Sequence, residues 1–220
     1  MPTTDRRAAR RQEILAATRR LFDERGVRDA QIEDIAQAVG INRAIIYRHF
    51  SGKEELFAMA LVVYLDEVDA ELTQAAEASD DPSERLVAII HAFLDYGEQH
   101  PAFVDCAQAL LRRRGDELMD EVSEPVMFRL GRAMTACMAH VVSVLEDGTE
   151  QGVFNVPNPD LVANIFYTQA LGVLNLATLR LAVRALDPGR PRVDPVPFEE
   201  VKDYVAQAAS AMARGPAPVP

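Results

Sequence analysis

The sequence predicts an all-α protein, and three observations carry this prediction. Apolar residues recur at helical spacing along most of the 220 residues. We find no stretch with the strict alternation of apolar and polar residues that is typical of a half-buried strand. Helix-start signals also divide the chain, because Asp81-Pro82 and Asn158-Pro159 each place a capping side chain before a proline of the first turn.

The most specific local pattern lies between Gly26 and Leu56. Residues 33–39 predict one short helix and residues 42–50 a second, with a tight turn at Gly40-Ile41 between them. This is the plan of a helix-turn-helix, whose second helix enters the major groove of DNA. A helix over residues 10–25 is expected to support the pair.

Each part of this pattern has a physical reason. The first helix has a buried stripe at positions i, i+3, i+4 and i+7, formed by Ile32, Ile35, Ala36 and Val39. Gly40 stands where the helix must end with a positive φ, which glycine adopts most easily. Asn42 is a favourable N-cap for the second helix.

The remaining sequence predicts further helices separated by short connections. One begins at Lys53 and ends near residue 77, and the next runs from Pro82 to an interruption at His100-Pro101. The others are expected at residues 101–111, 116–146 with an early kink or break at Pro125, 159–185 and 198–213, with a Pro-rich connection over 187–197.

Charge is distributed unevenly along the chain. The net charge is −11, which by itself argues against nucleic-acid binding. Residues 1–55, however, hold 11 Lys and Arg against 9 Asp and Glu, whereas the remainder holds 12 against 25. An acidic distal part would be repelled by phosphate, so we expect DNA to meet the N-terminal edge alone.

Residues 21–56 resemble the N-terminal signature of the TetR family of regulators. The matching positions are Leu21, Phe22, Glu24, Gly26, Ile32, Asp34, Ile35, Ala36, Ala38, Gly40, Tyr47, Phe50, Lys53, Glu54 and Leu56. The chain departs from the usual pattern at Ala30-Gln31, where the family has Thr-Thr, and at Asn42, where it has Ser. Either Asp29 or Gln31 would then replace the missing threonine cap.

The resemblance implies an N-terminal DNA-binding domain over residues 1–52, an effector-binding and dimerisation domain over 53–214, and a disordered tail over 215–220. It also implies a homodimer, paired through its last two long helices, that reads a palindromic operator in double-stranded DNA. The expected DNA contacts are Arg43, Ala44 and Arg48 on base edges, Tyr47, His49 and Lys53 on phosphates, and Gln31 and Asn42 beside them.

The resemblance further implies a repressor that leaves DNA when a small, mainly hydrophobic effector binds, and it implies no cofactor. We expect the effector pocket among apolar helices that carry methionines and a few polar groups. The candidate pocket residues are His91, Phe93, Tyr96, Met127, Met134, Met138, His140, Asn164, Tyr167 and Thr168.

Other readings remain open at this point. The chain could be a helical small-molecule carrier whose motif no longer binds DNA, or a regulator controlled by a protein partner. Cys137 and His140 lie three residues apart on one predicted helix and could bind a metal with His91 and Cys106. We expect no enzyme, because phosphate loops and nucleophile motifs are missing, and we expect a cytoplasmic protein without a membrane span.

Overall fold

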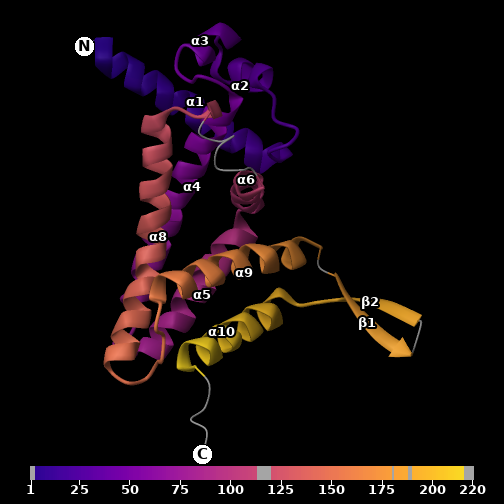
Figure 1. The fold of residues 1–220 in the computed structure, drawn as a ribbon. Helices are drawn as coiled ribbons and strands as arrows, with labels where there is room; N and C mark the ends of the chain where they lie inside the picture. Colours follow the sequence, from indigo (N-terminus) through magenta and orange to yellow (C-terminus); the bar gives the residue numbers. More distant parts are fainter. Residues whose placement is uncertain (1–2, 113–119, 180, 188–189, 216–220) are drawn as a thin grey trace, which may run out of the picture. The chain divides into compact units, whose positions relative to one another are not determined.

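The computed structural model describes residues 3–112, 120–179, 181–187 and 190–215 (Figure 1). The all-α fold class is confirmed, with one added β-hairpin. The helices are α1 (Thr3–Arg25), α2 (Ile32–Val39), α3 (Arg43–Tyr47), α4 (Lys53–Ala76), α5 (Pro82–Gln99), α6 (Pro101–Leu111), α8 (Glu124–Glu150), α9 (Pro159–Leu179) and α10 (Phe198–Arg214). The hairpin consists of β1 (Leu181–Asp187) and β2 (Arg190–Pro195). No helix in the described ranges combines the length and the apolar character needed to cross a membrane.

The chain divides into two compact units. The first comprises Met1–Asp66 and His100–Met134, and the second comprises Glu67–Gln99 and Thr135–Pro220. Helices α4 and α8 therefore each contribute residues to both units. Residues 53–66 belong to the first unit, together with the predicted helix-turn-helix.

Aromatic side chains build the core of the first unit. Phe22 of α1, Phe50, Tyr64 of α4 and Phe103 of α6 are each at most 2% exposed. The Tyr64 hydroxyl donates a 2.7 Å hydrogen bond to the carboxylate of Asp23, which ties α4 to α1. The support helix α1 is longer than the sequence predicts, since it already begins at Thr3.

The local signals of the helix-turn-helix appear in the structure as predicted. Gly40 has φ +71°, which ends α2 in the left-handed region. The side chain of Asn42 caps α3 by accepting a 2.9 Å hydrogen bond from the amide of Ala44. Helix α3 is shorter than the predicted 42–50, because regular helix ends at Tyr47 and a turn leads to Phe50.

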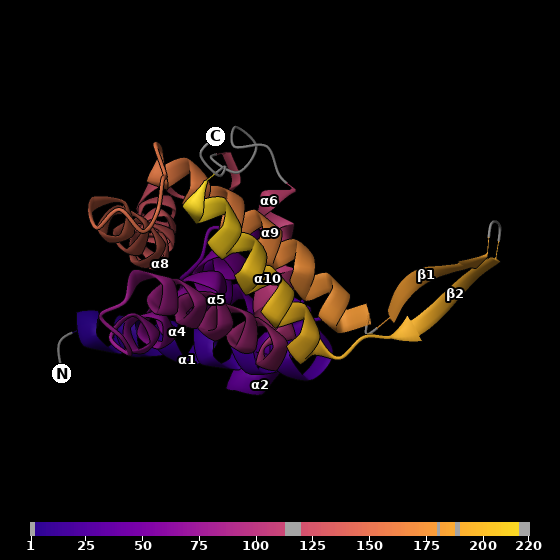
Figure 2. The same ribbon diagram turned by 90° about the horizontal axis from the view of Figure 1, so that it is seen from below.

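Helices α5, α9 and α10 of the second unit pack side by side (Figure 2). The α5–α9 contact is close at Gly97, where an added Cβ would come within 2.4 Å of the Leu174 side chain. Helices α5 and α10 are joined by buried Lys202, whose ammonium lies 2.5 Å from the Asp95 carboxylate and 2.8 Å from that of Glu199. Since α9 and α10 also contact each other, the three helices form one packed cluster.

Two expectations for the later chain need correction. Helix α9 ends at Leu179 rather than near residue 185, and a hairpin follows in place of the predicted helix end and connection. The prolines at 191 and 195 exclude a helix and push the residues before them into extended backbone, and β1 then pairs with this segment. Of the kink or break expected at Pro125, the structure shows a break, because α8 starts at Glu124 and places Pro125 in its first turn, where proline is tolerated.

The antiparallel register pairs Leu181 with Pro195 and Val183 with Val193. The hairpin projects beyond the ends of α9 and α10 (Figures 1 and 2). The beginning of the predicted 116–146 helix and the expected disordered tail beyond residue 215 fall outside the described residues.

Candidate nucleic-acid interface and effector cavity

Helix α3 is anchored on one side and free on the other. Ile46 is 1% exposed and faces the core of the first unit, whereas the Tyr47 side chain is 51% exposed. Arg43 and Ala44 are also exposed, so three of the predicted DNA contacts lie on the open side of the helix. This is the orientation that a recognition helix requires.

The first recognition residue is held in place by α2. The Arg43 guanidinium lies 2.9 Å from the Glu33 carboxylate, with both side chains exposed. The hydrogen bond from Arg43 lowers the pKa of Glu33 below its ordinary value. Arg43 is therefore presented in a defined position while it remains accessible.

The N-terminus of α2 shows which residue replaces the threonine cap that the sequence lacks. Gln31, and not Asp29, occupies the N-cap position. Its backbone amide donates a 3.3 Å hydrogen bond to the Asp34 carboxylate, which in turn lies 3.4 Å from Arg25. The exposed Gln31 side chain thus stands at the start of α2, in the same unit as α3.

His49 lies in a strongly cationic environment beyond the end of α3. Burial lowers its pKa below the ordinary value, and neighbouring arginines lower it further. These arginines are Arg7, Arg11, Arg10 and Arg48. The imidazole is therefore neutral at neutral pH and can donate a hydrogen bond, but it adds no charge of its own.

Lys53 begins α4 and is half-buried. Its ammonium lies 4.9 Å from the centre of the Phe57 ring. This cation–π contact holds the Lys53 side chain against α4. All eight predicted DNA contacts belong to the first unit; six of them are exposed, and His49 and Lys53 are half-buried.

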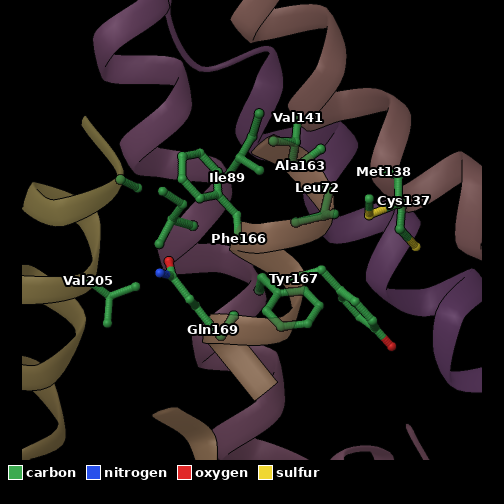
Figure 3. A pocket seen from close by; sticks show the side chains of 14 residues that line it. Leu72, Ile89, Cys137, Met138, Val141, Ala163, Phe166, Tyr167, Gln169 and Val205 are labelled. Atoms are coloured by element: carbon green, nitrogen blue, oxygen red, sulfur yellow. The ribbon is translucent and has the colours of Figure 1, made fainter. Parts of the chain in front are cut away.

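The second unit contains an apolar cavity of about 60 Å³. Its walls come from α4, α5, α8, α9 and α10, and the lining residues are Leu72, Ile89, Ile90, Phe93, Cys137, Met138, Val141, Ala163, Phe166, Tyr167, Gln169, Ala170, Val205 and Ala209. Gln169 extends towards Val205 on one side, and Cys137 and Met138 of α8 lie on the other (Figure 3).

The cavity has few polar groups. No charged side chain is among the lining residues, and hydrogen-bonding capacity is limited to the Gln169 amide, the Tyr167 hydroxyl and the Cys137 thiol. Burial raises the pKa of Tyr167 to about 12, so its hydroxyl stays protonated. The Tyr167 ring packs edge-on against Phe93, with 6.1 Å between ring centres.

Three of the ten predicted pocket residues line this cavity: Phe93, Met138 and Tyr167. Met127 and Met134 belong to the first unit instead. Tyr96 donates a 2.8 Å hydrogen bond to Glu67, and His140 lies 2.8 Å from Asp69.

The other three polar candidates also lie outside the lining. His91 lies 3.8 Å from Asp203, and the side chains of Asn164 and Thr168 donate to backbone carbonyls one turn earlier on α9. Sequence reasoning chose polar residues from these helices, whereas the cavity collects their apolar positions, such as Ile89 and Phe166.

The two cysteines of the metal hypothesis lie in different units. Burial raises the pKa of the Cys106 thiol to about 12, which disfavours the thiolate that metals bind. Among the residues that the structure describes, one cluster of three carboxylates is close enough to share an ion, and it consists of Asp95, Glu98 and Glu199. Two of these carboxylates already contact the Lys202 ammonium.

Comparisons with known proteins agree with this arrangement. Residues 14–60 match the family model for bacterial regulatory proteins of the tetR family. The chain is 31% identical over 159 residues to the HTH-type transcriptional repressor KstR2 of Mycobacterium tuberculosis, which covers 72% of this chain and 74% of that protein. It is 34% identical over 92 residues to the HTH-type transcriptional activator FasR of Mycolicibacterium smegmatis, 42% of each chain. The solved structure of ketosteroid transcriptional regulator KstR2 of Mycobacterium tuberculosis superposes with a TM-score of 0.59 at 25% identity, over 91% of this chain and 93% of that one.

An exposed recognition helix that packs with α1 and α2, in a chain that is mostly helical, defines a helix-turn-helix DNA-binding regulator. The matched relatives are themselves regulators of transcription. This chain belongs to the TetR family of transcriptional regulators. Proteins of this family bind DNA and ligands and function as dimers.

Proposed function

We propose that this protein is a homodimeric repressor that a small, mainly hydrophobic effector releases from a palindromic operator. The observation that carries the proposal is the apolar cavity in the unit that does not contain the recognition helix. The similarity of the chain to the repressor KstR2 supports repression as the regulatory output. The predicted domain division at residues 52 and 53 and the eight predicted DNA contacts are part of this proposal.

The chemistry of the lining favours an uncharged effector. A carboxylate or phosphate buried among these fourteen residues would have no cation to pair with, and burying an unpaired charge is strongly unfavourable. One hydroxyl or carbonyl could be satisfied by Gln169 or Tyr167. The similarity to a ketosteroid regulator is consistent with a neutral ring compound that carries a single carbonyl.

The size of the cavity adds a second requirement. A space of about 60 Å³ accommodates only a few atoms, whereas sites for drug-sized ligands are typically about 300–1,000 Å³. A ring compound must therefore displace lining side chains. Met138 is suited to this because its unbranched thioether adopts several rotamers at low cost.

An apolar surface on α9 and α10 supports the homodimer. Gly172, Val173 and Leu176 of α9 line a shallow groove with Val201 and Tyr204 of α10, and the Tyr204 side chain is 65% exposed. Small and apolar residues allow close helix contact, so a second copy is the proposed occupant. A symmetric dimer would present two recognition helices to half-sites about 34–36 Å apart.

Fluorescence anisotropy with a labelled operator tests the proposal. The operator is first selected from random DNA with the full-length protein, and then a neutral ketosteroid is compared with its carboxylic acid counterpart. We expect the neutral compound to release the DNA and the acid to need at least about tenfold higher concentration. Binding of neutral compounds with no change in operator affinity would refute effector control, and equal potency of the acid would refute the assignment of an uncharged effector.

A further inference from the structure

A cationic groove lies beside the helix-turn-helix in the first unit. It has a volume of about 440 Å³ and is lined by three segments of the chain. Helix α1 contributes Arg7 and Arg11, residues 47–55 contribute the end of the helix-turn-helix and Glu55, and the segment from Ser123 into α8 contributes Arg129. The groove therefore includes a residue far outside the helix-turn-helix sequence.

The positive charge in this groove is only partly compensated. Arg7, Arg11, Arg48 and Arg129 line it, against the single carboxylate of Glu55. That carboxylate is buried, accepts a 3.2 Å hydrogen bond from the Ser51 amide and lies 3.8 Å from Arg11.

Arg11 is the half-buried member of this group. Burial lowers its pKa, and the charges of Arg129 and Arg7 act in the same direction against the opposing effect of Glu55. Its Nε–H is buried without a hydrogen-bond partner in the described part of the chain, although one guanidinium nitrogen donates to the His49 carbonyl at 3.1 Å. A further anionic acceptor would satisfy this site.

Arg129 is exposed and has no ion pair or hydrogen bond with any described residue. Arg129 and Arg11 act on each other as neighbouring like charges. Among the described residues Arg129 thus has a like charge next to it and no partner, and its guanidinium is suited to bidentate binding of phosphate.

We propose that the groove binds a phosphate of the operator backbone and that Arg129 of α8 is a DNA contact. The groove shares Tyr47, Arg48 and His49 with the predicted DNA surface, so a duplex bound by α3 would pass next to it. The inference rests on DNA binding through α3, which Arg43→Ala tests separately, and it does not depend on the effector.

The salt dependence of DNA binding by Arg129→Ala tests this contact in the full-length dimer. Each phosphate contact contributes about 0.9 to the slope of log affinity against log salt, so losing one per protomer should lower the slope by about two. At about 100 mM salt we expect a loss of about tenfold or more, equal for operator and random DNA. Arg129→Lys should recover part of the affinity. Arg132→Ala is the matched control, because Arg132 is exposed on the same helix and does not line the groove.

Three further results would overturn the proposal. If Arg129→Ala has the same affinity and slope as Arg132→Ala, then Arg129 does not contact DNA. If inorganic phosphate or pyrophosphate at constant ionic strength raises the melting temperature of the wild type but not of Arg129→Ala, and DNA affinity is unchanged in the variant, the groove binds a soluble anion instead. The melting temperature of Arg129→Ala should equal or exceed that of the wild type, because a like charge next to Arg11 is removed. A lower melting temperature with an unchanged salt slope would assign Arg129 a purely structural role.

Discussion

Arg43 of the recognition helix and Glu33 of α2 form an ion pair of 2.9 Å. Both side chains are more than 60% exposed, so the pair adds little to stability. Its effect is to hold the guanidinium at the first position of α3. On DNA, Arg43 would exchange this carboxylate for the O6 and N7 atoms of a guanine.

Replacing Arg43 should therefore impair sequence recognition. We expect Arg43→Ala to cost about 1–3 kcal/mol of operator affinity and to relax the preference at one base position of each half-site. Competition binding against single-base operator variants measures this. Arg43→Lys is the control, since it keeps the charge but not the bidentate fork. An equal loss on operator and on random DNA would show that Arg43 contacts only the backbone.

Lys53 is predicted to contact a DNA phosphate and to add nothing to sequence specificity. Its ammonium is positioned over the Phe57 ring at the start of α4. Lys53→Ala should weaken all DNA sequences by a similar factor and lower the salt slope by about one unit per protomer. Titrations of operator and random DNA at several salt concentrations measure both effects, and a loss confined to the operator would contradict this role.

The cationic surroundings of His49 predict a pH dependence of stability. Because its pKa is lowered on folding, the unfolded chain binds more protons near the ordinary His pKa of about 6.5. The contribution of His49 to stability is therefore full above that pH and is lost as the pH falls below it. The free energy of unfolding in urea should fall less between about pH 7.5 and about pH 5.5 for His49→Gln than for the wild type. Parallel curves for the two proteins would contradict the prediction.

The cavity prediction can be tested by filling it. Ala163 is 1% exposed and lines the cavity, so Ala163→Leu should abolish effector release while operator affinity is retained. Ala163→Val is a milder variant in case the larger side chain prevents folding. Asn164→Ala changes the neighbouring exposed residue and should leave the response intact. If Asn164→Ala instead loses the response, the effector binds nearer the residues chosen from sequence.

The hydrogen bond from Tyr64 to Asp23 should contribute measurably to stability. Tyr64→Phe leaves the ring in place but removes the 2.7 Å bond to a carboxylate, which should cost about 1–3 kcal/mol. Urea unfolding of the variant gives this value. Tyr204→Phe is the control, because the Tyr204 side chain is 65% exposed and should change stability little. No difference between the two variants would mean that water replaces the lost bond.

Local signals account for what the sequence predicted well. Gly40 and Asn42 act through their own backbone and nearest turn, and the structure reproduces both the positive φ and the cap. The helix starts at Pro82 and Pro159 are equally local, with Asp81 and Asn158 accepting from the first-turn amides.

Features that depend on distant pairing were predicted only in part or not at all. The hairpin pairs Val183 with Val193, and neither segment has the alternation of apolar and polar residues that predicts a strand. The cavity depends on how five helices rotate about their axes, which decides that Phe166 lines it whereas Asn164 and Thr168 do not. The cationic groove was missed for the same reason, since Arg129 is far from Arg48 in sequence.

The narrowness of the cavity has a consequence for the speed of induction. A molecule larger than the space of about 60 Å³ can enter only while the surrounding side chains are spread apart. The observed association rate should then level off at high effector concentration, at the rate of this spreading rather than at the diffusional encounter rate. A regulator with such a gated entry would ignore brief pulses of its inducer and respond to sustained exposure.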